Sequence, residues 1–454
     1  MDARLYSLSE ASIAARIERL PPSGWHVRMR FIIGMATFFD AFDLITIATI
    51  LPTLVTLWKL TPPQIGWLIS IGFAGQAAGA IGFGYLAERL GRVRVAIFSI
   101  SIFSAISIVC AFANSYDQLV WLRFFQGVGL GGEVPIAAAY INEIAKSHKR
   151  GRFFLLYECV FLLGIAVCSL VGAFVVPRYG YYWMFLIGGI PALITVPLRR
   201  YCPESPRWLA SRGRLKEADR NLSAIEGIIA RTRVLPPPDA ARVHVAEHSD
   251  TRWTELFEGR YRKRTIVVWL LWFCSYLLSY GIGTWLPTIY QRNFHASVQE
   301  ALWFGAIATV ASLVAGLVCA LLIDDVGRKI WMTCAFALAA IPLLVLGTSA
   351  SPALLETVIF ATIGSACIIT VTIILYLYTP ELYPTRMRAL GTSWATFWPR
   401  VASIVGASMV GYVLPAYGVN GVFMVFGCIA LLGCLVCLTG GVETREQILE
   451  ELSP

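Results

Sequence analysis

A series of twelve long apolar runs limits this chain to very few folds. Each run has ~18–28 residues, which as an α-helix is long enough to cross the ~30 Å hydrocarbon core of a bilayer. The runs lie near residues 31–57, 65–87, 95–113, 118–143, 153–176, 181–198, 265–290, 300–323, 330–348, 353–379, 390–415 and 419–439. Only 14% of the residues are charged, whereas soluble domains have ~25%. We therefore expect an all-α membrane protein with twelve transmembrane helices.

The basic residues are concentrated in alternate loops. One set of loops carries Arg89, Arg92, Arg94, Lys146, Lys149, Arg150, Arg152, Arg328, Lys329, Arg386 and Arg388, and the other set carries only Lys59, Arg178 and Arg292. Because cytosolic loops hold the excess of lysine and arginine, both termini are expected in the cytosol, with the chain in a cell inner membrane. This topology explains the net charge of +9, and no nucleic-acid partner is expected.

The sequence repeats after about half its length. The segment 84–94 is similar to 320–329, and 140–152 is similar to 378–388. This pattern predicts two pseudo-symmetric six-helix bundles of the kind that alternating-access transporters use. The expected divisions are a cytosolic arm (1–30), an N-terminal bundle (31–198), a cytosolic linker with short helices (199–264), a C-terminal bundle (265–440) and a cytosolic tail (441–454).

Two acidic residues, Asp40 and Asp43, lie inside the first apolar run, in FFDAFDL. A charge at the bilayer centre costs at least ~2.5–3.5 kcal/mol on insertion scales, so such residues normally have a partner or a function. Their spacing of three places both on one helix face. By the helical rise, Asp43 lies ~20 Å from the cytosolic side and Arg123 ~8 Å from the outer side. These depths are similar, so we expect an Asp43–Arg123 ion pair, acting either in proton coupling or as a static link.

Three further charged residues are expected inside the bundle. Asp40 is level with Arg400, whose planar guanidinium suits a substrate carboxylate; the alternative is that Arg400 is the partner of Asp40. Glu133 and Glu158 have comparable depths by the helical rise. They form either a proton relay or a gate held by hydrogen bonds.

Aromatic residues are frequent in the segments that would face a central cavity. They are Phe38, Phe39, Tyr157, Trp272, Tyr276, Tyr280, Trp285, Tyr376, Trp394 and Trp398. As a set they favour an aromatic or planar substrate, because small-molecule pockets are mostly apolar and aromatic. Any one of them can instead belong to the aromatic belt at a membrane surface.

Several motifs resemble those of the major facilitator superfamily. The loop motif Gly-x-Leu-Ala-Asp-Arg-x-Gly-Arg-Arg appears as Gly84, Leu86, Glu88, Arg89, Gly91 and Arg92, with Glu88 in place of the usual Asp. The span-four motif appears as Arg123, Gly127, Gly129, Gly131 and Gly132. PESPRWL (203–209) resembles the signature of sugar porters and organic-ion transporters. FFDAFDL and YTPELYPTRMRALG are similar to metabolite:proton symporters near the aromatic-acid, nicotinate and organic-ion carriers. The paired glutamines of sugar porters are absent from span seven, which disfavours a sugar.

The resemblance implies roles for particular residues. An acid at the position of Asp43 takes up the coupling proton, an arginine at Arg123 modulates it, and anion-handling members carry an arginine at Arg400. The resemblance also implies a cytosolic gate. Its expected members are Glu88, Arg89, Arg92, Glu143, Arg152, Glu204, Arg207, Asp324, Arg328, Glu381 and Arg388. Across the loops, Glu143, Glu204, Glu381 and Glu443 are expected to face Arg152, Arg207, Arg386 and Arg388.

These observations predict a proton-coupled importer of a small organic anion, an aromatic or heterocyclic monocarboxylate. The expected substrate residues are Arg400, Asp40, Tyr157, Tyr280, Trp285, Tyr376, Trp394 and Trp398. Alternatives are an organic-cation or drug exchanger or exporter, a sugar:proton symporter, and a non-transporting sensor, which the retained acids disfavour. The five histidines lie in loops or at span ends, without a nucleophile triad or metal spacing, so an enzyme is not expected. The expected partners are a small molecule, the proton and the bilayer, with no cofactor and a monomeric chain.

Overall fold

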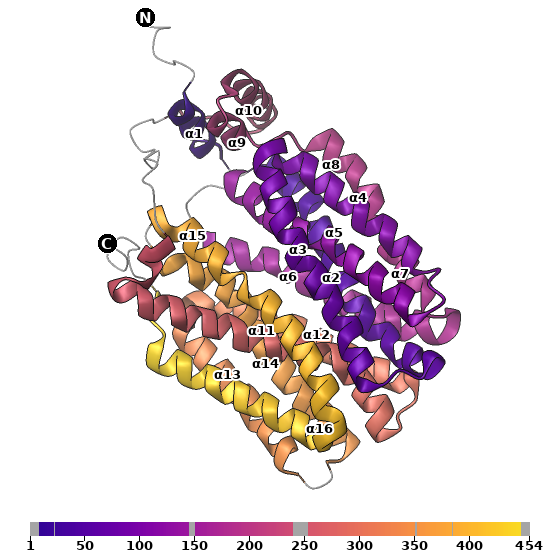
Figure 1. The fold of residues 1–454 in the computed structure, drawn as a ribbon. Coiled ribbons are helices and arrows are strands. Elements are labelled where there is room, and N and C mark those ends of the chain that lie inside the picture. The colour runs from indigo at the N-terminus through magenta and orange to yellow at the C-terminus, as the bar shows by residue number, and fades with distance from the viewer. Residues whose placement is uncertain are drawn as a thin grey trace, which may run out of the picture.

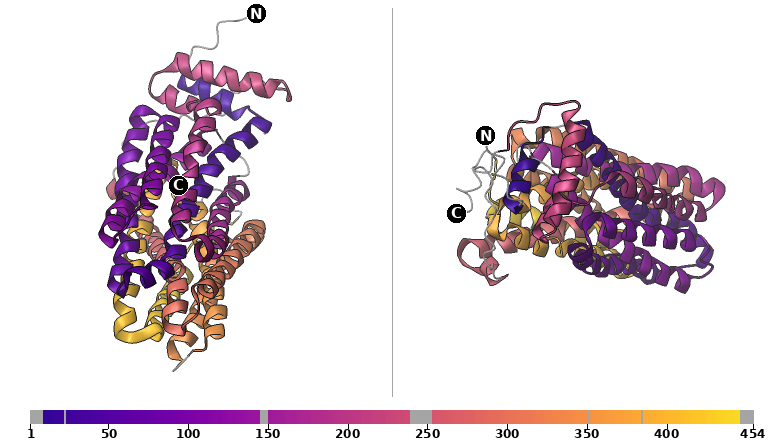
Figure 2. Two further views of the ribbon diagram at one scale, coloured as in Figure 1. Left: turned by 90° about the vertical axis from the view of Figure 1, so that its right-hand side faces the viewer. Right: turned by 90° about the horizontal axis from the view of Figure 1, so that it is seen from above.

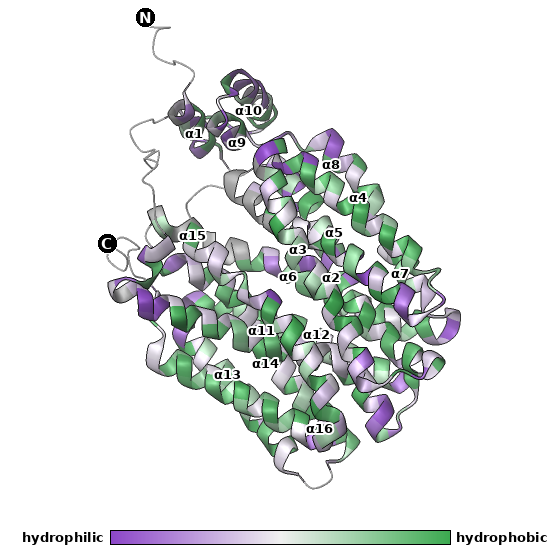
Figure 3. Cartoon of the chain, in the orientation of Figure 1, coloured by the Kyte–Doolittle hydropathy of each residue, from purple (hydrophilic) through white to green (hydrophobic). Residues whose placement is uncertain are grey.

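The computed structural model describes residues 9–21, 23–144, 150–238, 253–349, 352–383 and 385–445. These residues form helices and connecting turns, without a β-strand. Two groups of long helices, coloured indigo to magenta and salmon to yellow, lie side by side (Figure 1). Apolar residues cover most of their length (Figure 3).

The N-terminal half contains five long helices and one interrupted span. The long helices are α2 (Gly24–Trp58), α3 (Pro62–Leu90), α4 (Arg92–Cys110), α5 (Tyr116–Ile144) and α6 (Arg150–Tyr179). The sixth span, expected as one helix over 181–198, is instead α7 (Tyr182–Gly188), a 3-10 turn (Ile190–Ile194) and α8 (Thr195–Tyr201). Pro191 lies at the start of the 3-10 turn, and its lack of an amide N–H explains the interruption.

The C-terminal half repeats this arrangement. Its helices are α11 (Gly259–Phe294), α12 (Val298–Val326), α13 (Arg328–Thr348), α14 (Leu354–Glu381), α15 (Thr385–Ala395) and α16 (Trp398–Gly440). The run expected as one helix over 390–415 is interrupted between α15 and α16, where Pro399 follows the first residue of α16. Gly418, with φ of 66°, divides the remainder of α16 into two spans.

The number of spans agrees with the sequence. Ten helical segments of the described chain are long and apolar enough to cross a membrane. One of them, Leu390–Gly440, is 51 residues long and holds two spans around Gly418. Helix α5 is outside this set because it is less apolar and carries Arg123, Gln126 and Glu133, but it packs closely against α3 and α4. The ten segments, the second span within Leu390–Gly440 and α5 together make twelve spans.

Glycines bring α3 and α5 into backbone contact. A side chain added at Gly127 would collide with the carbonyl oxygen of Gly72, and one at Gly131 with that of Gln76. The span-four glycines therefore have the close-packing role that small residues have at helix interfaces in membranes.

The two halves are joined at the end of the bundle formed by the α2–α3 and α11–α12 turns, which we call the turn end. Between described residues, four hydrogen bonds cross from one half to the other: Ser70 Oγ to Ser408 Oγ (2.7 Å) and to the Ile404 carbonyl (3.0 Å), Gln291 Nε2 to Thr56 Oγ1 (3.0 Å), and Arg292 to the Leu60 carbonyl (3.1 Å). All four lie on the turn-end side of the bundle.

The other end, the cap end, carries three short helices on the N-terminal half (Figure 2). They are α1 (Glu10–Glu18), α9 (Pro206–Ser211) and α10 (Leu215–Ala230). Ile13 and Ile17 of α1 share one apolar cluster with Ile225 of α10. Arg16 pairs with Glu226 (2.7 Å), which also pairs with Arg19 (2.7 Å). Helix α1 is thus attached to α10 by both apolar and ionic contacts.

The attachment of α1 is expected to weaken in acid. Burial alone would raise the pKa of Glu226, but hydrogen bonds from Arg16 and Arg19 hold it below its ordinary value. The contribution of Glu226 is therefore complete above the ordinary carboxyl pKa of ~4.3 and is lost as the pH falls through the lowered pKa. Hydrogen–deuterium exchange of α1, corrected for its intrinsic pH dependence, should show less protection at ~pH 3, below the ordinary carboxyl pKa, than at pH 7.

Glu226→Gln is expected to lower protection of α1 at pH 7 and to remove most of this pH dependence. Lys216→Ala, on the exposed side of α10, is the matched control and should match the wild type. Full protection of α1 in Glu226→Gln would contradict the proposed attachment.

Candidate functional site

A cavity of about 150 Å³ lies between the two halves. It is lined by helices α2, α3 and α6 from the N-terminal half and α11, α12, α14 and α16 from the C-terminal half. A cavity of similar size in another protein holds one benzene ring. The cavity therefore has room for a small, single-ring molecule.

Arg400 and Asp40 both line this cavity. Arg400 Nη1 donates to the carbonyl oxygen of Thr396 (3.1 Å), at the break between α15 and α16, while its buried Nε has no hydrogen-bond partner. Asp40 is 4% exposed. No hydrogen bond or ion pair within 4.0 Å joins Asp40 to Arg400. Arg400 thus keeps N–H donors for a ligand, as expected of a carboxylate clamp.

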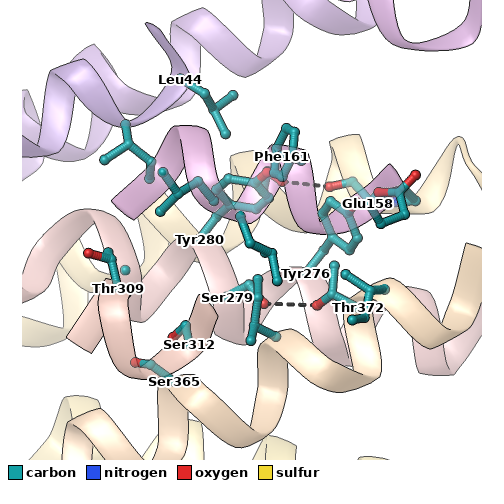
Figure 4. Close-up of a pocket in the computed structure, with 18 of the residues that line it drawn as sticks. Leu44, Glu158, Phe161, Tyr276, Ser279, Tyr280, Thr309, Ser312, Ser365 and Thr372 are labelled. Carbon is teal, nitrogen blue, oxygen red and sulfur yellow. Dashed lines mark hydrogen bonds between the residues drawn. The ribbon is translucent and has the colours of Figure 1, made fainter. Parts of the chain in front are cut away.

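The remaining wall is aromatic and hydroxyl-bearing. Tyr276 and Tyr376 share a hydrogen bond between their hydroxyl groups (2.9 Å), and Phe73 meets Tyr280 edge-on across the two halves, with ring centroids 5.0 Å apart. Ser279 bonds to Thr372 (3.1 Å), as Figure 4 shows. The wall presents flat apolar surfaces beside a few hydrogen-bonding groups.

Asp43 lies outside this cavity, in an enclosed polar cluster. It is 0% exposed, and its Oδ1 accepts hydrogen bonds from Gln126 Nε2 (2.8 Å) and Ser107 Oγ (3.2 Å). Arg123 Nη1 lies 3.6 Å from Asp43 Oδ2 and donates to Gln126 Oε1 (2.6 Å). The expected ion pair is present, with Gln126 as a bridge.

Sequence reasoning missed Gln126 and Ser107. Gln126 is three residues after Arg123 and therefore on the same face of α5, a signal that was available. Ser107 comes from α4, and nothing in the sequence indicated which of its serines faces Asp43.

Glu133 and Glu158 do not share one site. Glu158 lines the central cavity with Tyr157. Glu133 is 1% exposed, accepts a hydrogen bond from Thr37 Oγ1 (3.3 Å), and lines a separate small cavity.

The aromatic residues expected around the substrate divide into two groups. Tyr157, Tyr280 and Tyr376 line the cavity. Trp285, Trp394 and Trp398 do not line it. Trp285 is fully buried and donates to the Ala407 carbonyl (3.0 Å). The other two pack around Trp269, with centroid distances of 6.2 Å for Trp394 and 5.4 Å for Trp398. In this conformation they are structural.

The acids at the cap end bind helix N-termini. Glu204 was expected to face Arg207; instead it accepts from the backbone amides of Arg92 (2.8 Å) and Val93 (3.3 Å), the first residues of α4. Arg207 pairs with Glu18 of α1 (2.7 Å). This arrangement is favoured because the first amides of a helix lack intrahelical partners and carry its positive dipole end.

The second half repeats this contact. Glu443 accepts from the amides of Arg328 (2.9 Å) and Lys329 (3.0 Å), the first residues of α13. Arg328 also pairs with Asp324 (3.0 Å) and Glu381 (3.5 Å). Each of these gate contacts stays within one half or its own linker.

The structure describes the side chains of only some of the other expected gate residues. The Arg89 guanidinium lies over the Tyr85 ring, 4.4 Å from its centroid. The side chains of Glu88, Glu143, Arg152, Arg386 and Arg388 lie outside the described residues.

The fold and the central cavity define a membrane transporter of the major facilitator type. Residues 32–454 match the family described as "Sugar (and other) transporter". The chain belongs to this family of multi-pass membrane transporters, and it is a transporter rather than an enzyme.

Two named relatives cover almost the whole chain. The niacin transporter NiaP of Acinetobacter baylyi is 35% identical over 97% of this chain and 99% of its own length. The 4-hydroxybenzoate transporter PcaK of Pseudomonas aeruginosa is 28% identical over 92% of both chains. Among solved structures, the xylose transporter XylE from E. coli in a partially occluded inward-open conformation superposes with a TM-score of 0.73 at 18% identity, over 94% of this chain and 100% of XylE. This last similarity shows the fold.

Removing only one member of the Asp43–Arg123 pair is expected to be more harmful than neutralising both. Arg123→Gln leaves a buried carboxylate without its cation, a type of change that costs ~3–5 kcal/mol. Asp43→Asn combined with Arg123→Gln should recover most of this loss. Unfolding of the purified variants in detergent measures the difference. A double variant no more stable than Arg123→Gln would show that the pair does not contribute in this way.

Proposed function

We propose that this protein is a proton-coupled symporter that imports a small organic anion, an aromatic or heterocyclic monocarboxylate, by alternating access. The observation that carries the proposal is the Arg400 side chain, which faces an aromatic cavity with a buried N–H that has no protein partner. A buried cationic donor without a partner is costly, and a substrate carboxylate removes that cost.

The size and lining of the cavity support a single-ring substrate. Its volume of about 150 Å³ suits one ring. Aromatic surfaces against which a ring can pack are offered by Phe73, Tyr276 and Tyr280. The named substrates of two relatives, niacin and 4-hydroxybenzoate, are both single-ring monocarboxylates. Both observations favour an aromatic acid over a sugar.

Proton coupling is supported by the Asp43 cluster. A buried carboxylate is easier to protonate when a nearby cation moves away. Asp43 and Arg123 lie on different helices, α2 and α5, at 3.6 Å. A small relative movement of these helices during the transport cycle would change that distance and hence the proton affinity of Asp43. Arg123 therefore tunes proton release.

We also propose that the cap end faces the cytosol of a cell whose inner membrane holds the protein. Arg89, Arg92, Arg94 and Arg328 lie at the cap end, while the turn end has Lys59, Arg178 and Arg292. This excess of positive charge at the cap end is what the positive-inside rule requires of a cytosolic side. Because the described hydrogen bonds between the halves lie on the turn-end side, the conformation corresponds to a carrier closed to the outside.

Arg400→Lys is expected to weaken substrate binding by about tenfold or more, because lysine cannot form the two parallel hydrogen bonds of a guanidinium–carboxylate pair. Thermal-shift titration with a panel of aromatic monocarboxylates measures the affinity. Arg178→Lys, near the turn end and away from the cavity, is the matched control. Wild-type affinity in Arg400→Lys would exclude the clamp.

An inward proton gradient should accelerate uptake of such acids into proteoliposomes, whereas uptake independent of the gradient would contradict proton coupling. The second candidate function is a cation exchanger, which the carboxylates of Asp40 and Glu158 in the cavity favour. Adding organic cations as competitors in the same uptake assay tests it. Competition by cations and none by aromatic anions would reverse the assignment.

A further inference from the structure

A second cavity, of about 20 Å³, lies entirely within the N-terminal half. It is bounded by α2, α4, α5 and α8, and Glu133, Arg92 and Tyr140 are among its lining residues. Its volume is enough for one water molecule. Arg92 is the first residue of α4, and the Tyr140 hydroxyl donates to the Pro203 carbonyl (2.7 Å), so this cavity reaches the cap end.

The wall between the two cavities is a chain of hydrogen-bonding groups. Thr37 and Tyr157 line the central cavity, and their hydroxyl groups are 2.6 Å apart. Thr37 Oγ1 also lies 3.3 Å from Glu133 Oε1. Glu133 lines the second cavity, and its buried Oε2 has no hydrogen-bond partner. One side chain, Glu133, therefore meets the central cavity's hydroxyl groups on one side and the second cavity on the other.

Helix α2 carries both Thr37 of this wall and the two acids of the first span. Thr37, Asp40 and Asp43 follow one another at intervals of three residues, a rise of ~4.5 Å at each step. Ile33 and Ala36, in the next turn toward the cap end, line the second cavity. The polar positions of α2 thus form a winding line, from the enclosed Asp43 past Asp40 at the central cavity to Thr37 beside the second cavity.

We propose that protons leave by this line, through Glu133 and the second cavity, and that the substrate leaves separately through the central cavity. This inference rests on the proton coupling proposed above and adds a route to it. It assigns to Glu133 the role of a proton-transfer residue that does not touch the substrate.

The transfer conserves protons and charge. The coupling proton passes from Asp43 to Asp40, three residues along α2, and Asp40 releases it into the central cavity. The Tyr157–Thr37 hydroxyl pair takes it up there and passes its own hydroxyl proton to Glu133. Glu133 becomes a neutral carboxylic acid and then donates its proton to a water molecule in the second cavity. Rotation of the two hydroxyl groups restores the starting arrangement.

Glu133 is placed among groups that affect its charge. Asp40 of α2 and Glu158 of α6 act on it as neighbouring carboxylates, Tyr157 lies beside Thr37, and Arg92 and Tyr140 share its cavity. Cys202 is the remaining titratable group of the second cavity. Arg92 is permanently charged and does not accept the proton itself; it marks the point at which the second cavity reaches the cap end.

The decisive variant is Glu133→Gln, which keeps the shape and the acceptor for Thr37 but cannot carry a proton. In proteoliposomes with an internal pH dye, substrate-linked proton entry is expected to fall about a hundredfold or more, because a lost acid–base group typically costs ~10²–10⁴-fold. Exchange of labelled for unlabelled aromatic acid at equal pH is expected to continue, because Glu133 does not line the substrate cavity. Glu133→Asp should restore part of the proton flux.

A second variant tests the cavity without altering an acid. Ala96→Phe places a ring in the second cavity and should reduce substrate-linked proton entry as Glu133→Gln does. Ala105→Phe is its matched control on the exposed face of α4 and should behave as the wild type.

The outcomes separate this inference from the proposed function. If wild-type protein shows no substrate-linked proton entry, proton coupling itself fails. If the wild type shows it and Glu133→Gln matches the wild type, the route is wrong while the coupling stands. If Glu133→Gln loses exchange and proton entry together, Glu133 is a structural or substrate-site residue and the separate route is again excluded.

Discussion

The apolar interior of the bundle requires every buried charge to be satisfied by other parts of the protein, and this requirement determines where the polar residues lie. Asp43 has hydrogen bonds from Ser107 and Gln126 in addition to its arginine. The cluster therefore draws α2, α4 and α5 together around one carboxylate. Arg400 is only partly satisfied, by a carbonyl at a helix break. This difference in environment is the reason for proposing a proton site at Asp43 and a ligand site at Arg400.

The same contact, a glutamate carboxylate at a helix N-terminus, occurs once in each half at the cap end. Glu204 and Glu443 each approach the first amides of a helix that begins after a glycine with positive φ, Gly91 at 106° and Gly327 at 98°. A side chain at either glycine would collide with the acid. Internal duplication has thus preserved a physical contact, although the surrounding sequences differ and Glu443 lacks the preceding proline found in Pro203–Glu204.

The number of spans was predictable from the sequence because it follows from hydrophobic length, and the meeting of Asp43 with Arg123 because it follows from the fixed helical rise. Depth was enough to pair Asp43 with Arg123. It was not enough for Trp394 and Trp398, because depth does not give the direction in which a side chain points, and both pack around Trp269 instead. Glu204 was misassigned for a related reason: the linker's fold, with α9 beginning at Pro206, decides which partner the acid meets. Gln126 was detectable from its spacing, and Ser107 required the structure.

The contact surface between the two halves at the turn end, here called the seam, has a consequence for the energetics of the transport cycle. It consists of neutral hydrogen bonds, one arginine-to-carbonyl contact and close glycine contacts such as Gly66 with Ala407, and no described ion pair crosses it. Each neutral bond contributes only ~1 kcal/mol net, because water replaces it when the seam opens. The turn-end contacts therefore favour the closed state over an open one by only a few kcal/mol. A small ligand, whose affinities for the two states can differ only by a limited amount, can then shift the equilibrium between them.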